Sequence, residues 1–236
     1  MTLNPKIVSR DEWLAARAAL LAKEKAFTRQ RDALSAERRA MPWEPVERNY
    51  VFEGPSGKET LADLFGGKRQ LLVYHFMFDP SWEAGCKSCS FWADNFNGAV
   101  AHLAQRDVTL LAIARAPLAK LEAFKQRMGW TFKFVSSFGN SFNRDFNVSF
   151  TPEELNGEVY YNYRKTKFPA TEAPGVSVFY KDDDGRIFHT YSSFSRGLDM
   201  LNGAYHLLDI VPKGRDEDGL SYPMAWVKLH DLYEKK

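Results

Sequence analysis

Cysteine is scarce in this chain, which has two cysteines among 236 residues. A scaffold held together by disulfides and a four-ligand zinc ribbon both need more, so both classes are excluded. An excess of charge is also missing, because 32 Lys and Arg side chains nearly cancel 30 Asp and Glu side chains. The net charge of +2 gives no field that would favour nucleic acid or an anionic membrane as a partner.

Long apolar runs are absent as well. The run from Gln70 to Phe78 is far shorter than the roughly 20 residues that span a bilayer, and residues 1–10 lack the apolar segment of a secretory signal. We therefore expect a soluble cytoplasmic protein with no membrane partner. The hydrophobic share of 44%, with 14% aromatic residues, is enough for a packed core, and the length suits one α/β domain with extensions.

The first segment predicts a long amphipathic helix. Residues 9–12 form a capping-box pattern, Ser-Arg-Asp-Glu, and the chain reaches Pro42 before the pattern stops. Large apolar residues recur at every seventh position: Trp13, Leu20, Phe27 and Leu34. We expect an N-terminal helical extension over residues 1–45, whose apolar stripe packs on the main domain or pairs with a second subunit in a homodimer.

Residues 46–212 alternate strands and helices in the manner of an α/β domain. Continuous apolar runs at 71–78 and 108–114 predict strands that are buried on both faces. The other elements expected are strands at 49–52, 132–135, 176–180 and 186–191, and helices at 89–105, 117–128 and 197–210. This order predicts a central mixed sheet flanked by helices, with parallel crossovers first and an antiparallel hairpin around residues 182–185 last.

Two further segments fall outside this pattern. Residues 138–172 form an inserted loop that is rich in aromatic side chains, either a lid over a site or a satellite core. The aromatic residues concerned are Phe142, Phe146, Phe150, Tyr160, Tyr161 and Tyr163. Residues 213–236 are expected to be a C-terminal tail.

The two cysteines lie close together, at Cys86 and Cys89, between a buried strand and a helix. The first turn of a helix has free N–H groups and the positive end of the helix dipole, which favour a thiolate. In a reducing cytosol such a pair is more often catalytic or metal-binding than structural. We hypothesise that Cys86 is the attacking thiolate and that Cys89 resolves the mixed disulfide, with Lys87 adding positive charge beside Cys86.

The same cysteine pair is also compatible with two roles outside catalysis. In the first role, the cysteines form half of a zinc site that His75, His102 or His189 completes. In the second, they are inert core residues. A second CxxC or an HxxxH is missing, so we predict no metal and no cofactor. His189 shares a predicted strand face with Tyr191 and is a candidate proton shuttle; a copper-ligand role for His189 is the minority alternative.

The sequence around the dithiol resembles that of known thioredoxin-fold proteins. The stretch from Gly57 to Val73 resembles the opening of the alkyl hydroperoxide reductase/thiol-specific antioxidant group of thioredoxin-fold proteins. Together with Tyr74 to Phe78, Gly85 to Cys89 and Pro174 to Tyr180, it makes the chain similar to a bacterial thioredoxin-like family of unknown function, described as predicted dithiol-disulfide oxidoreductases. This resemblance covers roughly residues 10–215. It implies a thioredoxin-like fold and a thiol-disulfide oxidoreductase that acts on thiol or disulfide substrates, protein or small molecule.

The resemblance also implies a substrate groove. Thioredoxin folds place a cis proline before a strand that faces the dithiol, and Pro174 matches that position, so we expect a cis bond there. The backbone of Ala173 then pairs with the bound substrate. Trp82 replaces the aromatic residue that thioredoxins carry directly before the first cysteine.

Departures from the related families keep two alternative functions open. Peroxiredoxins have a Thr or Ser three residues before the reactive cysteine, and this chain has Glu83, although Pro80 is nearby. Arg196 is a candidate for a distal positive charge, although a solvated surface arginine is the plainer assignment. The alternatives are a thiol peroxidase of the peroxiredoxin-like type and a non-enzymatic module for protein binding or metal delivery.

Overall fold

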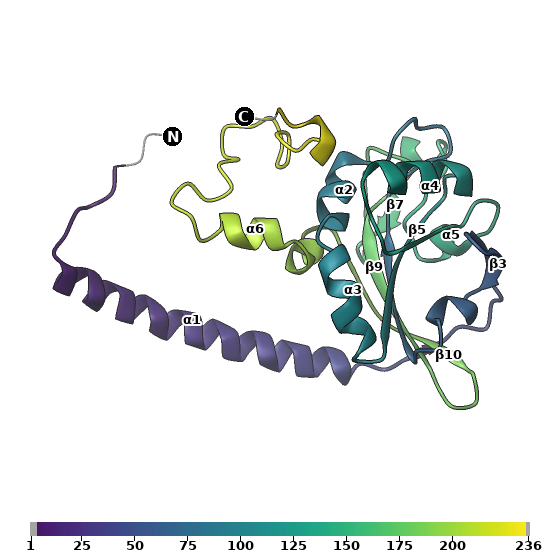
Figure 1. Ribbon diagram of the computed structural model, residues 1–236, viewed down its shortest axis with the longest axis horizontal. Coiled ribbons are helices and arrows are strands. Elements are labelled where there is room, and N and C mark those ends of the chain that lie inside the picture. The colour runs from purple at the N-terminus through teal and green to yellow at the C-terminus, as the bar shows by residue number, and fades with distance from the viewer. Residues whose placement is uncertain (1–3, 235–236) are drawn as a thin grey trace.

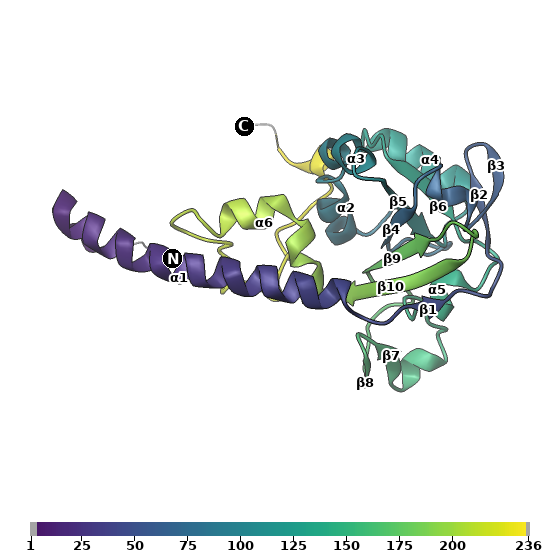
Figure 2. The same cartoon turned by 90° about the horizontal axis from the view of Figure 1, so that it is seen from below.

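The computed structural model describes residues 4–234. Its main feature is an eight-stranded mixed sheet with helices on both faces, as Figure 2 shows. The strands of this sheet, in spatial order, are β1 (Glu44–Pro45), β10 (Ile187–Phe194), β9 (Gly175–Lys181), β4 (Gln70–His75), β5 (Val108–Ala114), β6 (Lys133–Ser136), β2 (Val51–Gly54) and β3 (Gly57–Thr60). The α-helices are α1 (Arg10–Arg39), α2 (Lys87–Ala93), α3 (Asn97–Ala104), α4 (Leu118–Arg127), α5 (Phe142–Asp145) and α6 (Gly203–Leu208). A separate hairpin, β7 (Val159–Tyr161) and β8 (Arg164–Thr166), lies in the insertion.

The centre of the sheet is strand β4. It pairs in parallel with β5 and antiparallel with β9, and β5 pairs in parallel with β6. The α2–α3 segment connects β4 to β5, and the β9–β10 hairpin closes the unit. The predicted fold class, a thioredoxin-like α/β fold with a central mixed sheet, is therefore confirmed.

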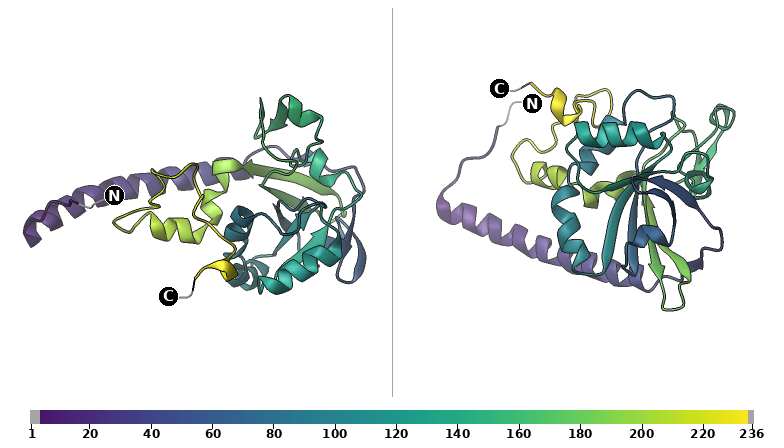
Figure 3. Two further views of the ribbon diagram at one scale, coloured as in Figure 1. Left: turned by 90° about the horizontal axis from the view of Figure 1, so that it is seen from above. Right: turned by 45° about the vertical axis from the view of Figure 1, so that its right-hand side comes forward.

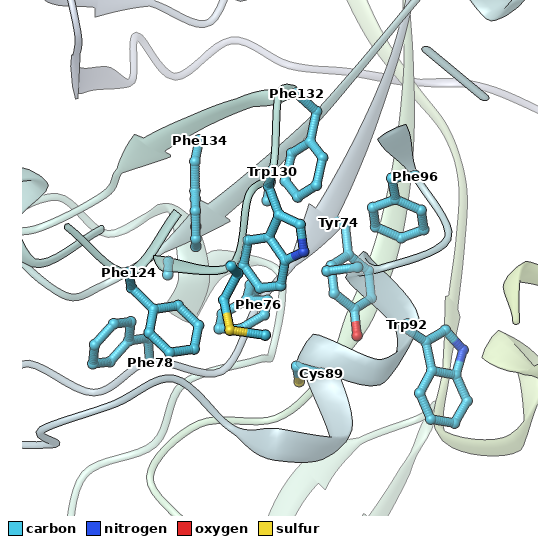
Figure 4. Close-up of a cluster of buried hydrophobic side chains, with 14 of the residues drawn as sticks. Tyr74, Phe76, Phe78, Cys89, Trp92, Phe96, Phe124, Trp130, Phe132 and Phe134 are labelled. Carbon is cyan, nitrogen blue, oxygen red and sulfur yellow. The ribbon is translucent and has the colours of Figure 1, made fainter. Parts of the chain in front are cut away.

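The alternation of side chains along β4 separates two cores. Tyr74 joins an aromatic core between the sheet and helices α2, α3 and α4, which Figure 4 shows in close-up. The neighbouring residue His75 faces the opposite side, where its ring lies 5.6 Å from that of Phe142 in α5. A second core on that side contains Phe52, Leu111 and other residues of β2, β4, β5 and β9. Both faces of β4 are thus buried, as its continuous apolar run predicts.

Two predicted helices are interrupted. The helix expected at 89–105 is divided into α2 and α3, and the side-chain amide of Asn95 donates to the carbonyl oxygens of Phe91 and Trp92 at the break. The helix expected at 197–210 consists of a 3₁₀ segment, Ser195–Leu201, followed by α6. The buried side chain of Asn202 accepts from the backbone N–H of Tyr205 and starts α6 afresh.

A bulge in β10 overturns one expectation of the sequence. His189 pairs with Phe179 of β9, but Tyr191 pairs with Val178, so one residue of β10 is extra. Because neighbouring residues of β9 face opposite sides of the sheet, His189 and Tyr191 do too, and their predicted common face is wrong. Ser192, which pairs with Ser177, is the residue that shares a face with His189.

Helix α1 extends away from the sheet, as Figures 1 and 3 show. Its capping box is formed, with Ser9 and Glu12 bonded reciprocally. No residue within α1 is buried: Trp13 is 56% exposed and Phe27 is 67% exposed. Among the described residues, no helix has both the length and the apolar character that crossing a membrane requires.

The C-terminal segment is packed against the sheet domain. The ring of Trp226 lies 5.5 Å from that of Phe91 in α2, and its indole N–H donates to Glu217. Glu217 also accepts from the hydroxyl of Tyr205. Leu229 is buried in the aromatic core beside α2. Residues 214–234 thus pack over the helix that carries the dithiol.

Candidate active site

The dithiol lies where β4 has ended and α2 begins. Cys86 is the N-cap residue of α2, and its backbone N–H donates to the carbonyl of Met77 at 3.0 Å. The carbonyl of Cys86 accepts from both the N–H and the hydroxyl of Ser90, which holds the first turn in place. Both cysteines are free thiols; Cys86 is half-buried and Cys89 is only 2% exposed. The first cysteine therefore meets solvent and the second does not.

The two thiols differ sharply in acidity. The Cys89 thiol donates a hydrogen bond to Cys86 and lowers the pKa of Cys86 to about 6; the backbone N–H groups of Cys89 and Ser88 act in the same direction, and burial opposes them. Burial raises the pKa of Cys89 well above its ordinary value, and the adjacent Cys86 sulfur raises it further. Lys87 turns away, since its ammonium donates to the carbonyl of Ala225 at 3.2 Å. The single negative charge of the pair therefore resides on Cys86.

A cavity of about 210 Å³ adjoins Cys89. Its apolar walls come from α2, from the insertion and from the C-terminal segment. The lining residues include Met77, Trp92, Tyr161, Phe168, Pro174, Leu198 and Met224. The buried side chain of Tyr74 also reaches this cavity from β4. Ser88, Arg196 and Asp199 add the polar part of the lining, and Arg196 is a largely exposed side chain that pairs with Asp199 at 3.1 Å.

The predicted groove residues fall in different places. Pro174 lines the cavity beside Cys89, and Ala173 before it is buried, with its N–H bonded to the carbonyl of Val148. The described residues contain no cis peptide bond, so the expected cis bond at Pro174 is wrong. The trans form is the more stable one for an X–Pro bond, and here the Pro174 carbonyl accepts from the Tyr161 hydroxyl at 2.7 Å. Trp82 packs at the margin of the aromatic core rather than in the cavity lining.

An ionic network that the sequence did not predict braces the loop before the dithiol. Arg115, just after β5, donates to Asp79 at 2.8 Å and to Glu172 at 2.6 Å. Asp79 also accepts from Ser81 and Thr171. The network thus joins the loop after β4 to the end of the insertion. Arg115 is 36 residues from Asp79 and 57 residues from Glu172 in the sequence, so no local sequence pattern indicates this network.

Burial acts differently on the two carboxyl groups of this network. Burial raises the pKa of Glu172 to about 7, although Arg115 and Ser149 pull it down. For Asp79 the effect of burial is outweighed by hydrogen bonds from Ser81 and Thr171 and by Arg115, so its pKa is lowered. Asp79 therefore carries the charge that pairs with Arg115 at neutral pH, while Glu172 is partly protonated.

The structure places His189 on the face of the sheet opposite to the dithiol. Its Nε2 lies 2.7 Å from the hydroxyl of Ser192, which lies 2.7 Å from the hydroxyl of Ser177, which in turn lies 2.8 Å from Nε2 of His75. His189 and Ser192 line a separate cavity of about 590 Å³, together with Glu44. The pKa of His75 is lowered to about 3 by burial and by His189. His189 is therefore not brought to the dithiol, and a shuttle to Cys86 has no path through it.

The aromatic insertion divides between both of the roles that its composition suggested. Phe142 and Phe146 belong to the second core, and Phe150 and Tyr161 belong to a third, smaller cluster. Tyr161 also lines the cavity beside Cys89. The insertion is therefore a satellite core that presents one wall to the site. Within the part of the chain that the structure describes, no cluster of three metal-ligating side chains is present.

The fold and the dithiol together define a thioredoxin-like protein with two free thiols at the start of a helix. The chain belongs to a bacterial protein family of unknown function (DUF899), whose family model matches residues 2–233. No curated protein matches the chain.

Several solved peroxiredoxin structures are similar in fold. The Xanthomonas campestris bacterioferritin comigratory protein, a structure described for its alkyl peroxide reduction activity, has 13% identity, with 70% of this chain and 94% of that chain covered and a TM-score of 0.48. The peroxidoxin BcpB of Mycobacterium tuberculosis has 12% identity, coverages of 68% and 93%, and a TM-score of 0.46. The mitochondrial 2-Cys peroxiredoxin of Plasmodium falciparum has 14% identity, coverages of 76% and 98%, and a TM-score of 0.41. Likeness this remote carries no information on activity.

The acidity of Cys86 predicts a measurable pH profile. Because the thiolate is the reactive form, alkylation of Cys86 by iodoacetamide should rise with pH through a midpoint near pH 6. Replacing the donor, Cys89→Ala, should move the midpoint to higher pH. Mass spectrometry of alkylation rates from pH 4 to pH 10 measures both. A midpoint near 9, the ordinary value for cysteine, would contradict the hydrogen bond from Cys89.

The packing around Gly85, directly before the dithiol, leaves no room for a side chain. A Cβ atom at this buried position would lie 2.5 Å from the ring of Phe76 and 2.8 Å from that of Phe124. Gly85→Ala should therefore lower the free energy of unfolding by about 1–3 kcal/mol. Gly98→Ala in α3 is the matched control, because a Cβ there meets no atom within 4 Å, and it should stabilise by about 0.5–1 kcal/mol. Equal effects in urea unfolding would contradict the constraint.

Proposed function

We propose that the protein is a thiol-disulfide oxidoreductase in which Cys86 attacks and Cys89 resolves. The observation that carries the proposal is the asymmetry of the pair: a half-buried thiol that is acidic, hydrogen-bonded by a fully buried thiol that is not. This is the arrangement that sequential attack requires, because only one sulfur has both access and negative charge.

The reaction balances without a cofactor. The Cys86 thiolate attacks one sulfur of a disulfide, the substrate S–S bond breaks, and a thiolate leaves as the mixed disulfide forms. Cys89 gives its proton to the departing thiolate and attacks the Cys86 sulfur. The bond between Cys86 and the substrate breaks as the Cys86–Cys89 disulfide forms, and the second substrate sulfur leaves as a thiolate that carries the charge which began on Cys86. The substrate is reduced by two electrons and the dithiol is oxidised by two.

Substrates of this reaction are thiols or disulfides, on proteins or on small molecules. Pro174, which lines the cavity beside Cys89, is the groove residue that supports this assignment. A reducing compartment such as the cytoplasm would keep the dithiol reduced. For a peroxidase, the loop before Cys86 offers the exposed carboxylate Glu83 where a hydroxyl would assist a peroxide. The geometry therefore supports disulfide exchange better than peroxide reduction.

We also propose that α1 pairs with α1 of a second copy of this chain. A helix of 30 residues is about 45 Å long, and its apolar residues at every seventh position form a continuous stripe. Trp13, Leu20, Phe27 and Leu34 are between 47% and 67% exposed in the single chain. A like helix would bury this stripe against a surface of the same length and pattern, which makes a homodimer.

Trapping tests the roles of the two cysteines. Reduced Cys89→Ser should accumulate a stable mixed disulfide at Cys86 with bis(2-hydroxyethyl) disulfide, and release one thiol per protein. The wild-type protein should release two and end as the intramolecular disulfide. Cys86→Ser should form no adduct, because burial keeps the pKa of its remaining thiol well above the ordinary value and the thiol stays protonated. Adducts of Cys86→Ser but not of Cys89→Ser would reverse the roles, and no adduct with either would refute thiol-disulfide exchange.

A parallel arm compares hydrogen peroxide with the disulfide. Both oxidants are given to the reduced wild-type protein at equal concentration, and loss of free thiol is followed. The disulfide should react faster. A faster reaction with peroxide, with a sulfenic acid trapped at Cys86, would support the thiol peroxidase instead.

The dimer is tested by charge on the stripe of α1. The double variant Leu20→Glu, Phe27→Glu should sediment as a monomer, whereas the wild-type protein should sediment as a dimer. Lys25→Glu, an exposed charge reversal on the opposite side of the helix, is the control and should remain dimeric. A monomeric wild-type protein at micromolar concentration would contradict the proposal.

A further inference from the structure

The cavity beside Cys89 contains one polar atom that the described structure leaves unsatisfied. The hydroxyl of Tyr74 is fully buried and forms no hydrogen bond with acceptable geometry to any described residue. It belongs to the lining of the cavity, and the group beside it is the Cys89 thiol. Figure 4 shows the ring of Tyr74 with its oxygen directed toward the helix that carries Cys89.

A buried hydroxyl without a partner is costly, and native structures rarely keep one. The ring itself is well held, with its centroid 5.1 Å from that of Phe96 and 6.3 Å from that of Phe76. Phenylalanine would provide the same packing at this position. The hydroxyl is therefore a donor without a strong acceptor, and the sulfur beside it becomes a strong acceptor only when it carries negative charge.

The second half of the exchange supplies that partner. In the reduced protein the Cys89 thiol donates to Cys86, so the Cys89 sulfur carries a proton and little charge. Once Cys86 is bonded to the substrate in the mixed disulfide, Cys89 must lose this proton before it can attack the Cys86 sulfur. The two groups that then favour its thiolate are the Tyr74 hydroxyl and the backbone N–H of Met77.

We propose that the Tyr74 hydroxyl donates a hydrogen bond to the Cys89 thiolate in the resolving step, and that the cavity they share holds an apolar side chain next to the disulfide of the substrate. This inference rests on the proposed oxidoreductase function and assigns a substrate class to it.

The substrate class follows from the walls of the cavity. Apart from the Tyr74 hydroxyl, the lining includes buried Trp92 and Leu198 and half-buried Met77 and Phe168. Of the charged lining residues, Asp199 is half-buried and Arg196 is exposed. A volume of about 210 Å³ accommodates one aromatic or branched aliphatic side chain but not a folded segment. A disulfide flanked by such a side chain would place its sulfur near the dithiol and its apolar group over Cys89, where it excludes water from the thiolate.

The first half of the experiment isolates the hydroxyl. Reduced full-length Tyr74→Phe and wild-type protein are mixed with the symmetric disulfide of acetyl-Cys-Phe-amide, quenched with acid at intervals and weighed by mass spectrometry. Formation of the mixed disulfide should be unchanged, because Cys86 keeps its donor. Its conversion to the Cys86–Cys89 disulfide should slow about tenfold at pH 7, and the pH dependence of that conversion should shift to higher pH.

Tyr205→Phe is the control, because it removes the hydroxyl of another buried tyrosine of the same core, one that donates to Glu217 and lies outside the cavity lining. Its resolving step should match that of the wild-type protein. Conversion by Tyr74→Phe at the wild-type rate would overturn the role of the hydroxyl. Equal slowing of both steps would overturn it too, since that result indicates a packing defect. No mixed disulfide in the wild-type protein would instead refute the oxidoreductase function itself.

The second half isolates the cavity. The disulfides of acetyl-Cys-Phe-amide and acetyl-Cys-Ser-amide have closely similar sulfur chemistry and differ in the neighbouring side chain. The wild-type protein should consume the first at least about tenfold faster at low substrate concentration. Leu198→Asp, which puts a charge in the cavity wall, should remove this preference. Equal rates for the two peptides in the wild-type protein would overturn the substrate assignment.

Discussion

The hydrogen bond from Cys89 to Cys86 is the interaction on which the rest of the site depends. It concentrates the charge of the pair on Cys86, which is half-buried, and keeps the proton on Cys89, which is fully buried. The bond requires α2 to begin at one position, and several constraints converge on it. The carbonyl of Met77 accepts from Cys86, the rings of Phe76 and Phe124 leave no room for a side chain at Gly85, and Arg115 anchors the preceding loop through Asp79. Several weak contacts together thus fix the start of α2, and with it the hydrogen bond in which Cys89 donates its proton to Cys86.

Strand β4 gives the molecule two chemically different faces. Tyr74 points to the dithiol, and the next residue, His75, starts a buried chain of hydroxyl groups that reaches His189 on the other side. The strict alternation of a strand separates these two polar systems although they are adjacent in sequence. The larger cavity belongs to the histidine face and the smaller one to the dithiol, so cavity size alone would have indicated the wrong place for thiol chemistry.

The insertion links the two ends of the site. Its last residues carry Glu172 and Thr171 into the network around Arg115, and its hairpin brings Tyr161 to the cavity and to the carbonyl of Pro174. Since the pKa of Glu172 is about 7, the charge within this brace changes over the neutral range. The loop that holds Cys86 and the cavity wall beside Cys89 are therefore connected through the insertion.

The sequence by itself determined the elements whose signals are local. The apolar runs predicted β4 and β5, the acidic turn predicted the β9–β10 hairpin, and the capping box predicted the start of α1. The cysteine spacing after a buried strand located the dithiol, because strand, loop and helix follow one another directly along the chain. These features depend on neighbours within a few residues, which a single sequence displays.

Only the tertiary structure decided what depends on distant partners. A one-residue bulge in β10 reversed the side of Tyr191, and the expected cis bond at Pro174 is trans. The Tyr74 hydroxyl, the Arg115 network and the cavity walls come from segments far apart in sequence, brought together by the pairing of β4 with β5 and β9. Residue type and spacing record which side chains are available. Whether these side chains come into contact depends on strand register and on packing across the sheet, which no local sequence pattern specifies.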